Sequence, residues 1–502
     1  MKRYSYREAL FVFCGLLLWF GRVSLERLAS GDEGFYLYAA SLITQGKTPY
    51  IDFFYPQAPL LPYIYAFAFH IGGESWESGR LFASIFPAIS GAMIYLLLIP
   101  SVRRMGALLG VLFFATSVFI FPWLPTAQTY GPSITFLLIS LFFVTREKFS
   151  LRSIFSCGLF LGLTVDVRIF FIGLLPFFLG YLWIRSEHSF EKFKRFAFFF
   201  LLGLGLALLP HLFFFLLDPQ AYWFNNLGYH LTRSGRTVGE SLEHKFQVAQ
   251  VLSGLRPSQK FGGYQFSLFF WGWGLVGIVS LVTRKAPSFS FFLALGLLVL
   301  HFLPEPTYVQ YFSTVFPFFL LAVFESLQSV FREKSVAALS LGAFIFLLSL
   351  SHFSIDVIRY TQTGKGVLGI PSEKLAEERK LSFLRTVSRE LNAALPSGAQ
   401  VAPLWPGYLI GTHLVASPGF ENHFTFRAGG QLGEEARGKF HVLRLDEVLS
   451  MIQKGQLSYV LGWKRDFRGP LIRELNKNGY KVMHEWGAVQ LRGQSSEVLS
   501  EK

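Results

Sequence analysis

Long apolar runs recur along most of this 502-residue chain, and short basic clusters separate them. An apolar stretch of about 20 residues is long enough to cross a bilayer as a helix. Hydrophobic residues make up 52% of the chain, charged residues only 16%, and the mean hydropathy is +0.41. We therefore expect an α-helical polytopic membrane protein with about eleven spans. They lie near residues 9–26, 80–100, 105–124, 127–145, 153–165, 168–184, 196–217, 264–282, 287–303, 308–328 and 335–352.

The basic clusters predict the orientation of these spans, because Lys and Arg accumulate in cytoplasmic connections. Every second connection is basic, which places the N-terminus and the other basic connections in the cytoplasm. The stretch 153–184 has basic residues on both flanks, so it must cross twice, with a turn at Asp166-Val-Arg168. The clusters are Lys2, Arg3 and Arg7; Arg103 and Arg104; Arg146, Lys148 and Arg152; Arg185, Lys192, Lys194 and Arg195; Arg284 and Lys285; Arg332 and Lys334.

The outer face then receives all the large polar segments. They are the loop 27–79, the loop 218–263, the turn at Glu305 and the tail. We predict a transmembrane module over 1–352 and a soluble domain over 353–502, the latter on the periplasmic side of the inner membrane. The first apolar run lacks a small-residue cleavage site and is followed by further spans, so it is expected to be an anchor.

Charge and cysteine content exclude two other classes of protein. The net charge of +14 is typical of nucleic-acid binding, but here the basic residues lie between apolar runs and report topology, so no nucleic-acid partner is expected. Cys14 and Cys157 each lie inside an apolar run, which leaves no disulfide framework and no thiol zinc site. Gly46-Lys47-Thr48 imitates the end of a P-loop, but Ser41 stands where a glycine is needed.

The tail from Ile355 changes to an ordinary charged composition of domain size. Ser372–Leu395 reads as an amphipathic helix that Ser372 could cap and Pro396-Ser-Gly398 ends. Short apolar runs at Val401–Trp405, Leu457–Trp463 and Ala488–Leu491 read as strands, and helical patterns at 445–454 and 469–478 alternate with them. These patterns predict a small α/β domain.

The first outer loop carries the strongest functional signal. Asp32 and Glu33 follow the first apolar run directly, and an aromatic-rich run from Tyr50 to Pro59 comes after them. An ionisable group at the mouth of a membrane bundle is a functional candidate by default. His211, His301 and His352 lie near the outward ends of spans and read as hydrogen-bonded packing. No cofactor is certain, and a divalent metal stays an open alternative.

Several stretches together resemble the C-type superfamily of integral membrane glycosyltransferases, in the branch of protein O-mannosyltransferases and lipid A aminoarabinose transferases. The resemblance covers about residues 10–350 and is strongest in the first loop. The order of the matching stretches and their placement on one membrane face are more specific than any single motif. The stretches are Gly31-Asp32-Glu33-Gly34 with Tyr36, Ala39-Ala40, Gly46, Pro49-Tyr50-Ile-Asp52, Pro56-Gln57-Ala-Pro59, Ser78-Gly79-Arg80-Leu81, Gly162-Leu-Thr-Val-Asp166-Val-Arg168, and Tyr311 with Pro317.

The resemblance implies a sugar donor carried on a polyprenyl phosphate. The chemistry agrees, because the acidic loop faces a compartment without nucleotide sugars. Transfer requires a base for the acceptor and cations for the departing phosphate. The implied partners are the lipid-linked sugar, the bilayer, and an envelope glycolipid, glycan or protein as acceptor. A secondary transporter or lipid flippase is the competing interpretation, but neither internal repeats nor charges near the bilayer midplane are found. A non-catalytic receptor or assembly scaffold is a third alternative.

The resemblance also implies roles for the acidic residues. Asp32 is expected to be the base or to orient the acceptor, although aspartate also suits the N-cap of a helix from Glu33 to Thr44. Glu33 is the second catalytic candidate, or a like-charged partner of Asp32. Asp52 equally suits a loop-bracing acceptor. The other substrate-site candidates are Tyr36, Gln57, Asp166 and His230.

Cationic residues are expected to bind the donor phosphate. Arg168 offers a planar fork to phosphate oxygens, or a salt bridge to Asp166. Arg80 either reaches the same site or snorkels at the interface. Tyr229 and His230 cluster with Arg233 and Arg236, over the donor or on anionic lipid headgroups. Tyr311 completes the donor set.

Two departures from the family pattern limit these expectations. Gln57 stands where many relatives carry Lys before the proline, and the segment Pro122–Pro132 lacks the acid that many relatives have. A two-acid or metal-bound site is therefore in doubt, and the sugar is unassigned.

Overall fold

The computed structural model describes residues 3–146, 149–232, 236–256, 264–283, 287–328, 335–351, 353–365, 367 and 369–494. Two compact units make up the chain. The first, here called the bundle unit, comprises 1–25, 80–212 and 236–360; the second, the loop–tail unit, comprises 26–79, 213–235 and 361–502. The boundaries of these units differ from those of the predicted segments 1–352 and 353–502. The loop–tail unit contains residues 26–79, which include the predicted first loop, together with the tail.

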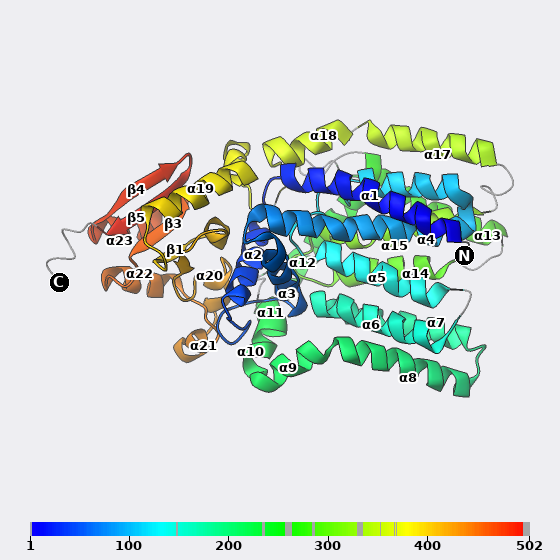
Figure 1. Ribbon diagram of the computed structural model, residues 1–502, viewed down its shortest axis with the longest axis horizontal. Helices are drawn as coiled ribbons and strands as arrows, with labels where there is room; N and C mark the ends of the chain where they lie inside the picture. The colour runs from blue at the N-terminus through cyan, green and yellow to red at the C-terminus, as the bar shows by residue number, and fades with distance from the viewer. Residues whose placement is uncertain are drawn as a thin grey trace. The chain divides into compact units, whose positions relative to one another are not determined.

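The bundle unit is helical. Its α5, α6 and α8 run side by side (Figure 1). The helices are α1 (Arg3–Glu26), α4 (Trp76–Thr116), α5 (Tyr130–Thr145), α6 (Leu151–Val167), η1 (Ile169–Leu174), α7 (Leu175–Arg185), α8 (Phe190–Ala207), α9 (Leu209–Leu217), α12 (Val238–Leu252), α13 (Tyr264–Thr283), α14 (Phe289–Phe302), η3 (Val309–Thr314), α15 (Phe316–Ser326), α17 (Ser335–Leu350), α18 (Phe353–Ile358) and η4 (Arg359–Thr363). The last residue of α1, the first residues of α4, most of α9 and the end of η4 belong to the other unit.

Each predicted span contains a helix, with differences at the breaks. Arg103, with φ 59° and ψ −177°, splits α4 where two spans were expected to meet. The second arm of α4 ends at Thr116, so the predicted span 105–124 is shorter than expected. Arg168 separates α6 from η1, as the proposed turn requires. The basic residues Lys148, Arg284, Lys285, Arg332 and Lys334 lie outside the described residues.

Length and apolar composition alone identify fewer crossings than the sequence predicts. Two described helices, Tyr6–Glu26 and Trp76–Thr116, pass such a test, and up to four pass if each bent pair is one span. One bent pair is α8 with α9, which meet at 50°. Several further apolar helices have 10–17 residues and fall below the length required, among them Tyr130–Thr145 and Ile169–Arg185.

The loop–tail unit begins with α2 (Gly31–Thr44) and α3 (Leu60–Gly72), followed after a long gap by α10 (Pro219–Trp223), η2 (Phe224–Gly228) and α11 (Tyr229–Thr232). α3 lies within the predicted loop 27–79, where no helix was expected. Its outward residues Tyr63, Phe67 and Ile71 recur every fourth position and are 40%, 56% and 67% exposed. Such an apolar stripe on a short helix suits a lipid interface.

The tail folds as a small α/β domain, as predicted. Its strands lie in the order β2-β1-β3-β5-β4, with β1 parallel to β2 and β3, and β5 antiparallel to β3 and β4. The elements are η5 (Glu373–Leu375), η6 (Glu377–Arg379), α19 (Leu381–Ala394), β1 (Gln400–Pro403), η7 (Pro406–Leu409), β2 (Val415–Ala416), α20 (Thr425–Gly429), α21 (Glu434–Lys439), α22 (Leu445–Gln453), β3 (Tyr459–Trp463), α23 (Gly469–Lys477), β4 (Tyr480–Trp486) and β5 (Val489–Gln494).

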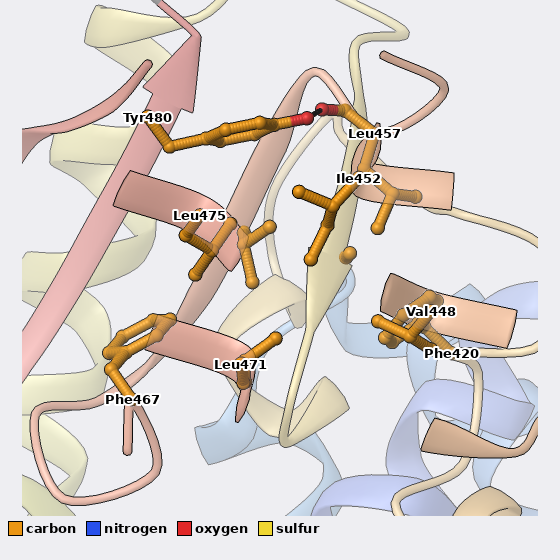
Figure 2. Packing of buried hydrophobic residues seen from close by; sticks show 10 residues of the cluster. Phe420, Val448, Ile452, Leu457, Phe467, Leu471, Leu475 and Tyr480 are labelled. Carbon is orange, nitrogen blue, oxygen red and sulfur yellow. Dashed lines mark hydrogen bonds between the residues drawn. The ribbon is translucent and has the colours of Figure 1, made fainter. Parts of the chain in front are cut away.

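A compact apolar core holds α22 and α23 against the sheet. Val448 and Ile452 of α22 meet Leu471 and Leu475 of α23, and each pair has the four-residue spacing of a helix face (Figure 2). Tyr480 of β4 closes the core by donating its hydroxyl proton to the carbonyl of Leu457.

One predicted tail element differs in its bounds. The helix expected over Ser372–Leu395 starts only at Leu381, and two 3-10 turns precede it. Ser372 is the N-cap residue of the first of these turns rather than of the helix. The apolar residues Leu384, Val387 and Leu391 begin their helical spacing only after this point, which is why the α-helix starts late.

Candidate active site

The acidic pair lies in the first turn of α2. Ser30 is the N-cap residue, with extended backbone, and the Glu33 carboxylate accepts hydrogen bonds from its amide at 2.9 Å and from its hydroxyl at 3.2 Å. This capping box satisfies donors at the helix start. The suggestion that Asp32 caps this helix is therefore wrong, because Ser30 holds that position. Glu33 is fully buried in a structural role, whereas Asp32 is only half-buried.

The rest of the first loop is braced by its own polar groups. The Asp52 carboxylate accepts the amide proton of Thr48 at 2.7 Å and is exposed, which favours the bracing role over substrate contact. The Tyr50 hydroxyl donates to the carbonyl of Gln57 at 2.6 Å, while the Gln57 side chain is half-buried. Tyr36 is buried, with its ring 4.1 Å from that of Phe35.

The segment 213–235 is held against the first loop within the same unit. Asn225 accepts the amide proton of Tyr55 at 2.8 Å, and the His230 ring nitrogen lies 3.1 Å from the carbonyl of Pro56. Tyr229 packs edge-on against Phe54. His230 is thus placed next to the Pro56-Gln57 stretch by a backbone contact. Arg233 lies outside the described residues.

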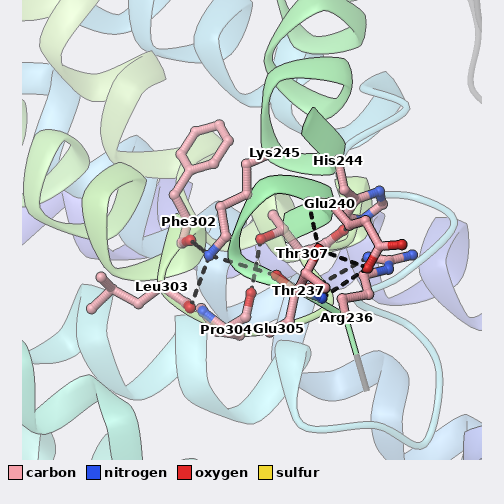
Figure 3. Close-up of polar contacts among 10 residues, drawn as sticks. All are labelled: Arg236, Thr237, Glu240, His244, Lys245, Phe302, Leu303, Pro304, Glu305 and Thr307. Atoms are coloured by element: carbon pink, nitrogen blue, oxygen red, sulfur yellow. Dashed lines mark hydrogen bonds and ion pairs between the residues drawn. The ribbon is translucent and has the colours of Figure 1, made fainter. Parts of the chain in front are cut away.

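Arg236 is anchored in the bundle unit instead. Its guanidinium is 2.9 Å from the Glu305 carboxylate, and Lys245 of α12 approaches the same carboxylate at 3.9 Å (Figure 3). Lys245 also donates to the carbonyl of Phe302 at 2.7 Å, and His244 lies 2.8 Å from that of Thr307. These contacts fasten α12 to the end of α14, and the ion pair with Glu305 gives Arg236 a structural partner within the bundle unit.

Arg168 occupies an aromatic box in the bundle unit. Its guanidinium carbon lies 4.5 Å from the ring centre of Phe170, 4.8 Å from that of Tyr311 and 5.3 Å from that of Tyr130. Nη1 is shielded from solvent and has no hydrogen-bond partner in the described part of the chain. Such a group costs free energy unless a ligand or water completes it.

The alternative partner for Arg168 is not found. Asp166 is buried and lies 3.3 Å from the Nε2 atom of His211, and no described residue forms an ion pair with Arg168. The alternative role for Arg168, a salt bridge to Asp166, is therefore not found among the described residues. Asp166 faces α9 instead, because it precedes the break in the backbone and Arg168 follows it.

Arg80 is completely buried and donates to the carbonyl of Ser24 on α1. It does not snorkel to an interface, because it is used to join α4 to α1 inside the bundle unit.

The described residues contain no group of three or more His, Cys, Asp or Glu side chains placed to hold a metal ion. Both ring nitrogens of His301 are used, since Nδ1 lies 2.7 Å from the Leu297 carbonyl and Nε2 2.9 Å from the Thr314 hydroxyl. This agrees with the packing role expected for it. His352 lies outside the described residues.

Two residues next to the acidic turn escaped the sequence analysis. Trp405 donates its indole proton to the carbonyl of Gly31 at 2.7 Å, and the carbonyl of Arg379 accepts from the amide of Ala29 at 2.7 Å. Both lie more than 340 residues further along the chain, so no local pattern could have found them.

Comparisons with known proteins give one match in sequence and several in fold. Residues 56–214 match the family model described as dolichyl-phosphate-mannose-protein mannosyltransferase. This segment contains Arg80, Asp166 and Arg168 but begins after Asp32. No curated protein matches the chain.

Among solved structures, ArnT from Cupriavidus metallidurans bound to undecaprenyl phosphate matches with a TM-score of 0.62 and 12% identity, over 97% of this chain and 98% of that one. The oligosaccharyltransferase AglB from Archaeoglobus fulgidus, in complex with an inhibitory peptide and a dolichol-phosphate, matches with a TM-score of 0.51 and 12% identity, over 99% of this chain and 75% of that one. The arabinofuranosyltransferase AftD from Mycobacteria matches with a TM-score of 0.51 and 11% identity, over 98% of this chain and 40% of that one. The chain thus shares its fold with these solved structures over nearly its whole length, and it matches the mannosyltransferase family model in sequence over residues 56–214.

Proposed function

We propose that this protein is an integral membrane glycosyltransferase that moves a sugar from a polyprenyl-phosphate carrier to an acceptor of the cell envelope. The fold is shared over nearly the full length with ArnT, which was crystallised with undecaprenyl phosphate. The segment 56–214 matches a family described by a lipid-phosphate-linked mannose donor. The observation that carries the proposal is Arg168, whose shielded Nη1 atom lacks a hydrogen-bond partner in the described part of the chain.

Arg168 is proposed to bind the phosphate of the carrier. The flanking rings of Phe170 and Tyr311 fix the plane of the guanidinium and leave its edge to make hydrogen bonds. A planar guanidinium suits paired phosphate oxygens, and a charge-assisted hydrogen bond is about twice as strong as a neutral one. Phosphate binding would supply the partner that Nη1 lacks and would stabilise the charge on the departing phosphate.

Asp32 is proposed to be the general base that takes a proton from the acceptor. Glu33 is occupied by the capping box, so Asp32 is the more accessible carboxylate of the turn. A general base must be reached by the acceptor, and the half-buried Asp32 meets that requirement better than the buried Glu33.

The proposed topology has about eleven crossings, with a cytoplasmic N-terminus, in the inner membrane. The broken span at Arg168 supports the double crossing of 151–185, and the break at Arg103 supports a hairpin in α4. The tail would then lie on the periplasmic side, as would the loop that carries Asp32.

The test measures transfer of a radiolabelled sugar from its polyprenyl-phosphate carrier in membrane vesicles. Asp32→Asn keeps the size of the side chain but removes the base, and we expect a loss of about 10² to 10⁴-fold in rate. Arg168→Ala should weaken carrier binding, while Arg168→Lys should keep part of it because the charge remains.

Gln247→Ala on α12 serves as a control in the vesicle assay, since its amide bonds only the neighbouring Glu243. Transfer by Asp32→Asn within about threefold of wild type would remove Asp32 as the base. Unchanged carrier affinity in both Arg168 variants would remove the phosphate-binding role.

A further inference from the structure

The backbone that leads into the acidic turn of α2 is held at two points by the C-terminal domain of the same unit. Before Asp32, the amide of Ala29 donates to the carbonyl of Arg379 at 2.7 Å. At the residue directly before Asp32, the indole of Trp405 donates to the carbonyl of Gly31 at 2.7 Å. The backbone on which Asp32 stands is therefore fixed by two hydrogen bonds from distant segments.

The sheet explains why Trp405 is well placed for this contact. β1 and β3 are parallel neighbours, with Pro403 opposite Leu461. Trp405 and Trp463 each lie two residues after that pair. Both therefore stand at the carboxyl ends of these adjacent strands. Their rings lie 3.5 Å and 4.5 Å from the guanidinium carbon of Arg379, which is 3% exposed.

The indole ring of Trp405 packs directly against α2 at Gly34, where there is no room for a side chain. A Cβ atom added at Gly34 would lie 2.5 Å from the indole ring of Trp405. Glycine is thus required at this position of the helix, since any side chain would displace the ring. A helix usually avoids glycine because it lowers helix stability, so its presence here marks the close approach.

We propose that Trp405 is a positioning residue for Asp32, through the carbonyl of Gly31. The C-terminal domain then acts in the transfer step by fixing the geometry of the base, in addition to any part it has in holding the fold. This inference rests on the proposed function, because it assumes that Asp32 acts on the acceptor. A misplacement of a reacting group by about 1 Å costs roughly 10²-fold in rate, so one lost backbone anchor is enough to be measured.

Trp405→Phe is the direct test. The substitution keeps an aromatic ring against Arg379 but removes the hydrogen bond to Gly31. We expect kcat for transfer to fall about 10- to 100-fold, with KM for the lipid-linked donor within about twofold of wild type.

Trp486→Phe is the matched control. Trp486 is 8% exposed against 6% for Trp405, and its indole donates to Glu390 at 2.7 Å. It belongs to β4, the strand at the far edge of the sheet. This variant loses an equivalent indole hydrogen bond and should lose similar thermal stability, yet keep kcat within about threefold.

Gly34→Ala approaches the same contact from the helix side. It should lower kcat as Trp405→Phe does, because the new methyl group pushes the indole away. Gly438→Ala on α21 is its control, since no atom lies within 4 Å of the added Cβ. Combining Gly34→Ala with Trp405→Phe should cost less than the product of the two single losses, because both act through one contact.

The inference is overturned if Trp405→Phe and Gly34→Ala both keep wild-type kcat, or if Trp405→Phe loses no more activity than Trp486→Phe at equal melting temperature. In either case a simultaneous loss of transfer in Asp32→Asn would leave the proposed function intact. Wild-type transfer by Asp32→Asn would instead show that Asp32 is not the general base, which both the proposed mechanism and the role of Trp405 assume.

Discussion

Asp32 and Glu33 are neighbours with the same chemistry, yet the fold gives them different environments. Glu33 is fully buried and accepts two hydrogen bonds from Ser30, while Asp32, at the preceding position of the turn, is half-buried. Only one carboxylate of the pair can complete the capping box, because the box requires the third residue of the helix. The proposal that Asp32 is the base rests on that exclusion.

Replacement of Glu33 should separate these two roles. Glutamine also completes a capping box, so Glu33→Gln should keep transfer within about threefold of wild type. Glu33→Ala removes the acceptor and should lower the free energy of unfolding by about 0.5–2 kcal/mol. Thermal melting and the vesicle assay measure the two effects. A loss of transfer in Glu33→Gln as large as in Asp32→Asn would show that the pair acts as two catalytic acids.

Glu421 predicts a pH dependence of the stability of the C-terminal domain. Its Oε2 atom is shielded and lacks a hydrogen-bond partner among the described residues. Burial raises the pKa of this carboxyl to about 8, against a partial opposing effect of Lys47 and of backbone hydrogen bonds. The folded state therefore favours the protonated form. This contribution is complete below the unfolded pKa and is lost as pH rises through about 8.

Melting temperatures between about pH 5 and pH 9 measure that contribution. The wild type should lose stability toward the alkaline end, and Glu421→Gln should lose less, because its amide is neutral throughout. Equal slopes for the two proteins would mean that Glu421 is ionised in the folded state. Glu434→Gln, on an exposed turn of α21, controls for the general effect of removing a charge.

Close helix contact in the bundle depends on glycines rather than on large apolar side chains. A Cβ atom at Gly158 of α6 would lie 1.9 Å from the carbonyl oxygen of Phe200 on α8, and one at Gly203 would lie 2.1 Å from that of Phe155. Small residues allow helix backbones to approach closely where lipid provides no hydrophobic drive between helices. This contact holds α6, whose end carries Asp166 and is followed by Arg168.

Alanine at Gly158 should therefore disrupt the packing of α6 on α8. Overpacking of this kind costs typically 1–3 kcal/mol, so we expect a lower melting temperature in detergent and weaker carrier binding at Arg168. Gly180→Ala on α7 is the control, because an added Cβ meets no atom within 4 Å there. A Gly158→Ala protein with unchanged melting would show that α8 moves aside without cost.

The orientation of the whole molecule is tested by its connections and its tail. We predict that reporter fusions at Arg104, Arg152 and Lys192 report the cytoplasm, and that fusions at Lys47, Ser241 and Gly398 report the outer side. The reason is that basic connections stay in the cytoplasm, and an odd number of crossings separates the N-terminus from the tail. Protease added to intact spheroplasts should cleave the tail. Complete protection until lysis would refute the eleven-span topology.

The sequence by itself determined the class of this protein and most of its elements. Apolar length and basic flanks predicted helices at each expected span, and short apolar runs predicted the strands β1, β3 and β5. These signals are local, so a single window of residues contains them. The strand β4 was missed because its middle residues are exposed and show no apolar alternation. The Ser30–Glu33 box was readable but was assigned to Asp32.

Only the tertiary structure decided what surrounds the candidate site residues. Phe170 and Tyr311 frame Arg168, and Trp405 fixes Gly31 from 374 residues away. Such contacts form when distant segments pack, and no spacing in the sequence encodes them. The choice of His211 over Arg168 as the neighbour of Asp166 has the same origin, since a backbone break turns the two charges apart. Local chemistry fixed which residues were available, and packing fixed which of them meet.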